Sequence, residues 1–363
     1  SRKNTTSMIK VKTVAYKGSK RKLLENIEQF AEEINAKTVF DGFSGTGIVS
    51  AFFRSKGYTV CANDLNDSSY LYGRVFLEGY DQDTVQSVIE EMNTLKPVDG
   101  WLTENYSGTK ERVIRGTNGR IEERPKAFSV VNARKLDAAR EYLETVDIPE
   151  RDKNAAVFSV VLAADSVFNN GNDQKSSLKE WCTKAKRDVI FKMPTLIQGP
   201  VGTQHKGDIK DMNTPAVDFA YLDPPYTHGV LYSTCYHLND SITSWHKPPL
   251  DHSYALPRPE KICFRKNGQS TGPFYSKQTA SEDFSELIGS IDCKRLVLSY
   301  SDAPRNVLSI EELVEICSRY GECKVVSRDH RICTQANSMK KISSSLKEYF
   351  VVLDKEQNFH LDK

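Results

Sequence analysis

Residues 38–64 contain the pattern that most restricts the fold of this chain. A short apolar run, TVFD at 38–41, is followed by the turn GFSGTG, an apolar helical stretch and a second apolar run, YTVCAND at 58–64. This order predicts a strand, a tight turn, a helix and a parallel second strand. Such a βαβ unit is typical of α/β folds, in which helices cover both faces of a mostly parallel sheet.

The alternation of strands and helices continues, with one long interruption. A helix is predicted at 66–79, and further strands are predicted at 217–223, 294–302, 323–330 and 348–354. Between these parts the strand pattern is lost, and helices are predicted at 134–144 and 152–168. We therefore expect a catalytic domain built from 8–94 and 193–363, with an inserted, partly helical domain at 95–192.

Composition indicates a folded protein without a strong charge bias. The 363 residues are 39% hydrophobic, and 50 basic against 48 acidic residues give a net charge of +2, so any nucleic-acid-binding surface must be local. No apolar run approaches the roughly 20 residues that span a bilayer, and the N-terminus lacks the apolar core of a secretory signal. The eight cysteines form no CxxC pair or Cys/His cluster, which disfavours a zinc site and a disulfide framework.

The turn after the first strand and the end of the second strand predict a nucleoside-binding site. Ligands of open α/β sheets bind at the carboxyl ends of the strands. Gly42, Gly45 and Gly47 permit positive φ and a close approach of backbone to ligand. Asp64 can accept hydrogen bonds from ribose hydroxyls. A dinucleotide fold has similar spacing, but Ser50 occupies the position of its third glycine.

The strand at 217–223 ends in the sequence DPPY. Because proline has no N–H, Pro224 and Pro225 offer carbonyl acceptors without donors, beside the acceptor-only carboxylate of Asp223. Two acceptors that hold an exocyclic amine favour its pyramidalisation and stabilise the positive charge that develops on nitrogen during attack. Tyr226 offers an aromatic face to a base drawn out of its helix. The alternative is an ordinary strand-ending turn.

At these positions the chain resembles the amino-group DNA methyltransferases of the DNA adenine methylase type. The segments that carry the resemblance are AYKGSKRKLL, FDGFSGTG, ANDLN, HKGDI, DFAYLDPPY and YHLNDSI, and it covers about residues 10–90 and 195–355. It implies a Rossmann-like, S-adenosylmethionine-dependent methyltransferase with its target-recognition region in the insertion. The implied reaction is site-specific methyl transfer to N6 of adenine in double-stranded DNA, by base flipping and without a metal.

The resemblance also implies roles for individual residues. Asp223, Pro224, Pro225 and Tyr226 would be catalytic. Lys20 would suit the methionine carboxylate, with a solvated helix start as the alternative. The implied cofactor-binding residues are Tyr16, Gly18, Lys20, Asp41, Phe43, Gly45, Gly47, Asp64 on the ribose, Asp208 on the adenine edge and Ile209 on the adenine ring.

The DNA-binding residues are expected in the insertion and after DPPY. Tyr232 and Tyr236 would shape the target pocket, although core packing is equally expected for them. A charge run alone favours a solvated surface, but the resemblance favours DNA contact, with arginines on base edges and lysines on phosphates. The basic residues concerned are Arg112, Arg115, Arg120, Arg124, Lys184 and Lys186.

Two alternative functions stay open beside DNA adenine methylation. Related loops serve ribosomal-RNA guanine and protein-glutamine methylation, so an RNA base methyltransferase is one alternative, and a non-catalytic nucleic-acid-binding subunit is another. The intact Asp223 and glycine loop argue against the second. The expected partner is double-stranded DNA, without a membrane, in the bacterial cytoplasm or nucleoid. The resemblance leaves open a cognate restriction endonuclease that acts on the same site.

Overall fold

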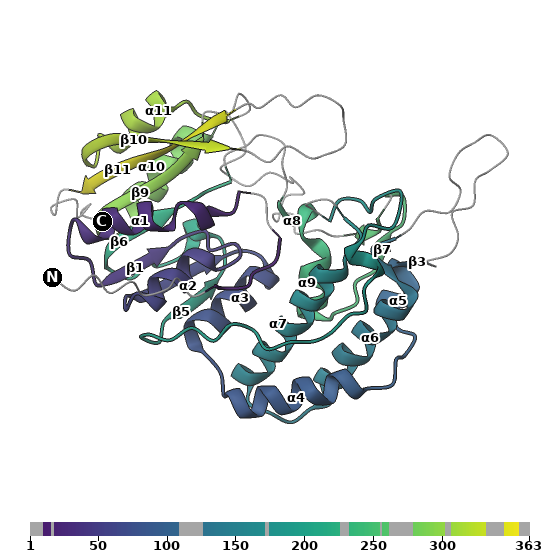
Figure 1. Cartoon of the computed structure of the whole chain (residues 1–363). Helices are drawn as coiled ribbons and strands as arrows, with labels where there is room; N and C mark the ends of the chain where they lie inside the picture. Colours follow the sequence, from purple (N-terminus) through teal and green to yellow (C-terminus); the bar gives the residue numbers. More distant parts are fainter. Residues whose placement is uncertain are drawn as a thin grey trace, which may run out of the picture.

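A seven-stranded sheet forms the centre of the protein, seen in a computed structural model (Figure 1). The structure describes residues 10–15, 18–108, 126–170, 174–225, 232–254, 256–260, 279–301, 306–331 and 345–355. The strand order is β10-β11-β9-β6-β1-β2-β5. The strands are β1 (Thr38–Asp41), β2 (Thr59–Asp64), β5 (Thr203–Lys206), β6 (Val217–Leu222), β9 (Cys293–Ser301), β10 (Gly321–Arg331) and β11 (Ser345–Lys355).

The sheet is mostly parallel, as predicted. β1 pairs in parallel with β2 and β6, and the parallel pairing extends from β2 to β5 and from β6 to β9. β11 is the exception, because it runs antiparallel to both of its neighbours, β9 and β10. The expectation of a Rossmann-like α/β fold is therefore confirmed.

Helices cover both faces of the sheet because alternate residues of each strand face opposite sides. Val39 and Phe219 belong to the apolar core on one face, together with residues of α1, α2 and α3. Phe40 and Ala220 belong to the core on the other face, with residues of α10 and α11. The bounds are η1 (Lys20–Lys22), α1 (Leu24–Glu32), α2 (Ile48–Ser55), α3 (Asp67–Glu78), η3 (Ile209–Asp211), α10 (Ala280–Ser290) and α11 (Ile310–Cys317).

A helical part lies beside the sheet, and α3 contacts both α7 and α9 within it (Figure 1). Its elements are α4 (Gln82–Thr94), α5 (Trp101–Tyr106), β3 (Ser107–Gly108), β4 (Phe128–Ser129), α6 (Val130–Thr145), α7 (Glu150–Val167), η2 (Lys184–Lys186), α8 (Tyr232–Cys235), α9 (His237–Ser244), β7 (Leu250–Asp251) and β8 (Arg258–Pro259).

The chain that follows DPPY packs against the helices of the predicted insertion. Arg140 Nε donates to the Ile242 carbonyl at 2.7 Å, and the Tyr106 hydroxyl donates to the Pro257 carbonyl at 3.0 Å. α4, which precedes residue 95, packs on α6 and α7. The domain boundaries at residues 95 and 192 stay a prediction.

Candidate active site

Four acidic residues lie along one edge of the sheet, at the carboxyl ends of adjacent parallel strands. Asp41 ends β1, Asp64 ends β2, Asp208 follows β5 and Asp223 follows β6. The strand order β5-β2-β1-β6 places these strand ends side by side. This edge is where open α/β sheets bind ligands, and it contains most of the described residues that the sequence assigns to the cofactor and the target amine.

The glycine loop folds tightly between β1 and β2. Gly45 and Gly47 have φ of 51° and 74°, values that favour glycine. The Gly45 N–H donates to Asp64 Oδ2 at 2.8 Å, which fixes the loop to the end of β2. A Cβ on Gly42 would lie 2.5 Å from Leu222 Cδ2 and 2.7 Å from Ile209 Cδ1, so a larger residue here would force these two side chains to shift.

Asp41 lies beneath this loop and is only 1% exposed. Its Oδ2 accepts a 2.6 Å hydrogen bond from Ser50 Oγ, so the residue that replaces a third glycine holds a buried carboxyl in place. Burial raises the pKa of Asp41 to about 7, and the charges of Asp64 and Asp223 add to the rise while the Ser50 hydrogen bond opposes it. These contacts indicate that Asp41 supports the glycine loop. Direct contact of Asp41 with a cofactor stays a prediction.

Lys20 links the start of the chain to the DPPY loop. Its Nζ lies 3.2 Å from Asp223 Oδ1 and 2.8 Å from Glu348 Oε1. Lys20 is 7% exposed, so the alternative of a solvated helix start is wrong. Burial raises the pKa of Asp223 to about 6, while Lys20 lowers it and Glu348 raises it. The residue predicted to bind the methionine carboxylate thus contacts the predicted catalytic carboxylate.

The other described residues of the predicted cofactor site differ in exposure. Gly18 has φ 77°, and no heavy atom lies within 4 Å of a Cβ built there. Phe43 is half-buried against the α10–α11 core, which also contains Ile209. Asp208 is the N-cap of η3, and its Oδ1 accepts from the Lys210 N–H at 3.1 Å. Their roles toward a cofactor stay predictions.

The predicted DNA-contacting and target-pocket residues are only partly described. Tyr236 is 3% exposed, and Tyr232 begins α8. Lys184 Nζ donates to Asn170 Oδ1 at 2.9 Å, which gives this lysine a structural contact, whereas Lys186 is exposed. The predicted residues that lie outside the described chain are Tyr16, Tyr226, Arg112, Arg115, Arg120 and Arg124.

Residues that sequence analysis missed support the site from other elements. Glu348 of β11 contacts Lys20, and Ser299 of β9 donates a hydrogen bond to Glu348. Asp240 of α9 accepts from the Ser68 N–H and Oγ at 2.9 and 2.6 Å, which ties α9 to the start of α3. Burial raises the pKa of Asp240 to about 6. The one sequence signal was an acid inside an apolar strand pattern, Glu348 in EYFVVLD.

Gln174 connects the end of the insertion to the segment that follows DPPY. Its side-chain Oε1 accepts from the Leu238 N–H at 2.9 Å and from the Asn239 N–H at 3.1 Å. These N–H groups belong to the first turn of α9, where helical N–H groups have no partner within the helix. Gln174 therefore caps α9 from a distant part of the chain.

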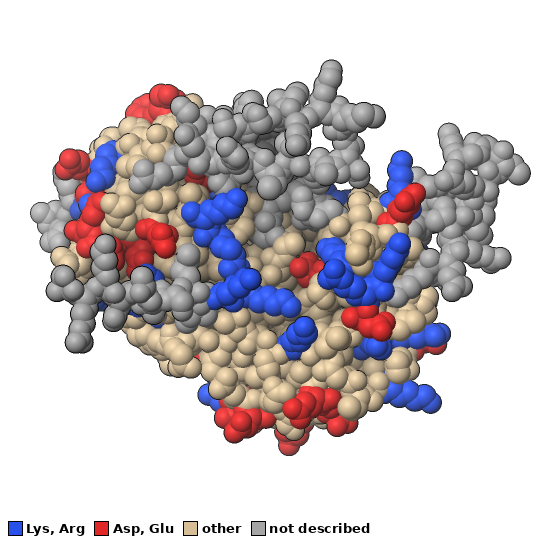
Figure 2. Space-filling model, in the orientation of Figure 1, with Lys and Arg blue, Asp and Glu red and all other residues tan. Residues whose placement is uncertain are grey.

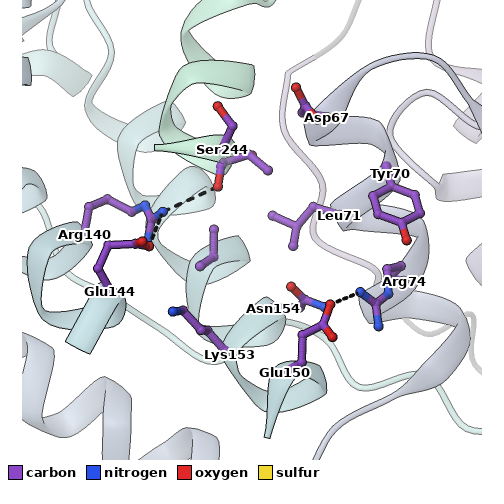
Figure 3. A pocket seen from close by; sticks show the side chains of 12 residues that line it. Asp67, Tyr70, Leu71, Arg74, Arg140, Glu144, Glu150, Lys153, Asn154 and Ser244 are labelled. Carbon is purple, nitrogen blue, oxygen red and sulfur yellow. Dashed lines mark hydrogen bonds and ion pairs between the residues drawn. The ribbon is translucent and has the colours of Figure 1, made fainter. Parts of the chain in front are cut away.

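A cavity of about 330 Å³ lies between α3, α6, α7 and the end of α9 (Figure 3). Arg140 pairs with Glu144 at 3.1 Å and Arg74 pairs with Glu150 at 2.5 Å. With Asp67 and Lys153 the lining has three acids and three bases, so its balanced charge favours no ionic ligand. None of the predicted site residues lines this cavity.

The sheet edge has features that fit a nucleoside with a charged tail. Asp64 and Asp208 supply carboxylate acceptors, and they lie at the ends of neighbouring strands. A Cβ on Gly207, beside Asp208, would meet no heavy atom within 4 Å, which indicates open space.

Within the described residues, no group of three or more His, Cys, Asp or Glu side chains could hold a metal ion. No described helix is long and apolar enough to cross a membrane.

A parallel sheet in this strand order, with a glycine loop after β1 and DPPY after β6, defines a Rossmann-like methyltransferase. Comparison with known families identifies the class more closely. The chain belongs to the D12 class N6 adenine-specific DNA methyltransferases, whose sequence pattern matches residues 16–248. It is therefore an enzyme that methylates DNA site-specifically at N6 of adenine, and the alternatives of an RNA substrate or a non-catalytic subunit are not supported.

Several methyltransferases are similar to this chain over most of its length. Type II methyltransferase M.CviAII of Paramecium bursaria Chlorella virus 1 is 27% identical over 340 residues, which cover 88% of this chain and 92% of that protein. Type II methyltransferase M.NlaIII of Neisseria lactamica is 25% identical, with 94% and 99% covered. Modification methylase LlaI of Lactococcus lactis subsp. lactis is 24% identical over 94% of this chain and 55% of its own length.

Proposed function

We propose that Asp223 accepts a hydrogen bond from the N6 amine of an extruded adenine while S-adenosylmethionine lies along the loops that follow β1, β2 and β5. The observation that carries the proposal is the asymmetry of the Asp223 carboxylate. Oδ1 is held by Lys20 at 3.2 Å, whereas no residue in the described part of the chain donates to Oδ2. One oxygen is thus positioned by the protein and the other is left for a ligand.

The chemistry needs alignment and acceptors. When bound, S-adenosylmethionine supplies a methyl group on a sulfonium, which is already a good leaving group. Asp223 and the carbonyl acceptors of Pro224 and Pro225 would hold both amine hydrogens and stabilise the positive charge that grows on N6. Because a paired adenine is inaccessible inside a duplex, the base must leave the stack, and Tyr226 is the proposed stacking partner.

The cofactor-binding residues are assigned by their position at the carboxyl ends of the parallel strands. Asp64 would accept from the ribose hydroxyls and Asp208 from the adenine amine, with Gly45 and Gly47 allowing close backbone approach. The fixed position of Asp64, which accepts from the Gly45 N–H at 2.8 Å and from the Asn66 N–H at 3.0 Å, supports this assignment. Gly18 and Phe43 would complete the site.

Asp64→Ala is expected to weaken binding of S-adenosylhomocysteine at least about tenfold, or 1.4 kcal/mol. The variant removes the proposed ribose acceptor and also the partner of the Gly45 N–H. Calorimetry measures the affinity directly. Asp83→Ala, at an exposed position of α4, is the control and should bind as the unchanged enzyme does. Equal affinities for both variants would remove Asp64 from the cofactor site.

The insertion at 95–192 is proposed to recognise the target sequence. Figure 2 shows Lys and Arg side chains gathered across the middle of one face, between the sheet part and the helical part, with Asp and Glu mostly toward the outer ends. Such a distribution suits a polyanion, because phosphate contacts supply much of the affinity for DNA. The names of the relatives, two type II methyltransferases and a modification methylase, support a partnership with a restriction endonuclease.

Two kinds of basic residue should differ in their effect on DNA binding. At least one alanine substitution among the arginines of the insertion is expected to relax sequence preference, because arginine contacts guanine edges. Lys186→Ala should weaken all duplexes alike and reduce the salt slope by about one unit. Binding to cognate and scrambled duplexes across a salt series measures both effects, with exposed Lys96→Ala as control. If every arginine variant kept affinity and preference, recognition would lie elsewhere. The arginines to be tested are Arg112, Arg115, Arg120 and Arg124.

A further inference from the structure

Glu348 is a buried carboxylate that contacts Ser299 and Lys20. It lies on β11 and is 5% exposed. Its Oε1 accepts a 2.5 Å hydrogen bond from Ser299 Oγ on the neighbouring strand β9, and the same atom lies 2.8 Å from Lys20 Nζ. A buried carboxylate is costly unless it is paired and hydrogen-bonded. These contacts satisfy that requirement and fix the position of the carboxylate relative to the sheet.

The contacts form a chain that ends at the proposed acceptor. Ser299 holds Glu348, Glu348 holds the ammonium of Lys20, and Lys20 reaches Asp223 Oδ1 at 3.2 Å. Lys20 lies closer to Glu348 than to Asp223, so the carboxylate on the sheet anchors the ammonium. Because Lys20 holds Oδ1, the Asp223 carboxylate is oriented, and within the described residues nothing donates to Oδ2.

We propose that Glu348 is a positioning residue for methyl transfer. Through Lys20 it fixes the Asp223 carboxylate with one oxygen available to the target amine, and its negative charge sets the pH range in which Asp223 accepts a hydrogen bond. The inference rests on the proposed function of Asp223.

The charges around Asp223 determine the direction of the pH effect. Lys20 approaches from η1, Glu348 from β11 and Asp41 from β1, and Tyr221 lies on β6, which ends just before Asp223. Lys20 lowers the pKa of Asp223, whereas burial and Glu348 raise it to about 6. A neutral side chain of the same shape at position 348 should therefore lower the pKa of Asp223, because a like charge is removed.

Glu348→Gln tests the charge without removing the hydrogen-bond acceptor. The test is the single-turnover methylation rate with saturating duplex and cofactor between about pH 5 and pH 9. The acid limb of the profile should move to lower pH by about one unit, while the plateau rate stays within about threefold. Glu322→Gln makes the same change at an exposed position of β10 and should leave the profile unchanged.

Glu348→Ala tests the positioning itself. Lys20 then loses its 2.8 Å contact with Glu348, and the plateau rate should fall at least about tenfold because a misplaced acceptor is costly. The affinity for S-adenosylhomocysteine, measured by calorimetry, should stay within about threefold. If Glu348→Ala does not fold, the pH profile of Glu348→Gln alone tests the proposed role of Glu348.

The inference is overturned if the acid limb of Glu348→Gln coincides with that of the unchanged enzyme. It is also overturned if a folded Glu348→Ala variant keeps the full plateau rate. An active Asp223→Ala enzyme would instead refute the proposed function, whereas an inactive Asp223→Ala enzyme with an unshifted Glu348→Gln profile refutes only the role of Glu348.

Discussion

Asp223→Ala is expected to lower the methylation rate by about 100-fold to 1,000-fold, the loss typical when a group aimed at developing charge is removed. The variant lacks the acceptor proposed for the target amine, and it removes the contact of Lys20 with Asp223 while that with Glu348 stays. Cofactor binding should change less than about tenfold, since the ribose and adenine contacts are assigned to other strands. The effect should therefore appear in the chemical step.

Rapid-quench measurement of methyl incorporation into a cognate duplex tests this expectation, alongside calorimetry with S-adenosylhomocysteine. Asp223→Asn keeps the shape of the side chain and should be almost as slow, because an amide carries no charge to stabilise the transition state. Asp211→Ala, at an exposed position of η3, is the control. An Asp223→Ala enzyme that methylates at the normal rate would exclude the proposed mechanism.

The parallel centre of the sheet could be predicted because its sequence signals are local. The apolar run at 38–41 predicts a strand, and β1 occupies Thr38–Asp41. The run at 217–223 predicts another strand, and β6 occupies Val217–Leu222. Buried parallel strands have continuous apolar sequences, and their following loops carry the functional residues. The glycine loop, Asp64 and Asp223 are brought to one edge for this reason.

Strand direction and the edge strand could not be predicted in the same way. β11 runs antiparallel to β9, but apolar alternation is the same in either direction. β5 has the polar sequence TQHK, of which only Gln204 is buried, because it is the outermost strand and has a neighbour on one side only. Its pairing with β2 depends on the packing of α3 against it, which is not a local property of the four residues.

The partners of Lys20 depend on tertiary structure. The sequence places this lysine in a glycine turn before a helix, where a cofactor carboxylate and solvent are both reasonable partners. The observed partners, Asp223 and Glu348, come from distant strands that become neighbours only through the sheet order. A single acid in an apolar strand signals a buried charge that needs a cation, but it does not identify which cation.

Lys20→Met is expected to lower both stability and activity. The variant removes the ammonium that contacts both Asp223 and Glu348. Breaking a buried ion pair costs about 3–5 kcal/mol. Lys20 lowers the pKa of Asp223, which burial raises to about 6, so its loss should raise that pKa further. The methylation rate at pH 7 should fall at least about 100-fold, with partial recovery toward higher pH as Asp223 ionises.

Denaturant unfolding and a pH series of single-turnover rates measure these effects. Lys22→Met, at an exposed position of the same turn, is the matched control and should change neither. The double variant Lys20→Met with Glu348→Gln should be more stable than Lys20→Met alone, because it removes the carboxylate left without a cation, and such non-additivity is expected only for interacting residues. If Lys20 instead binds only the methionine carboxylate of the cofactor, Lys20→Met will weaken S-adenosylhomocysteine binding and leave the acid limb in place.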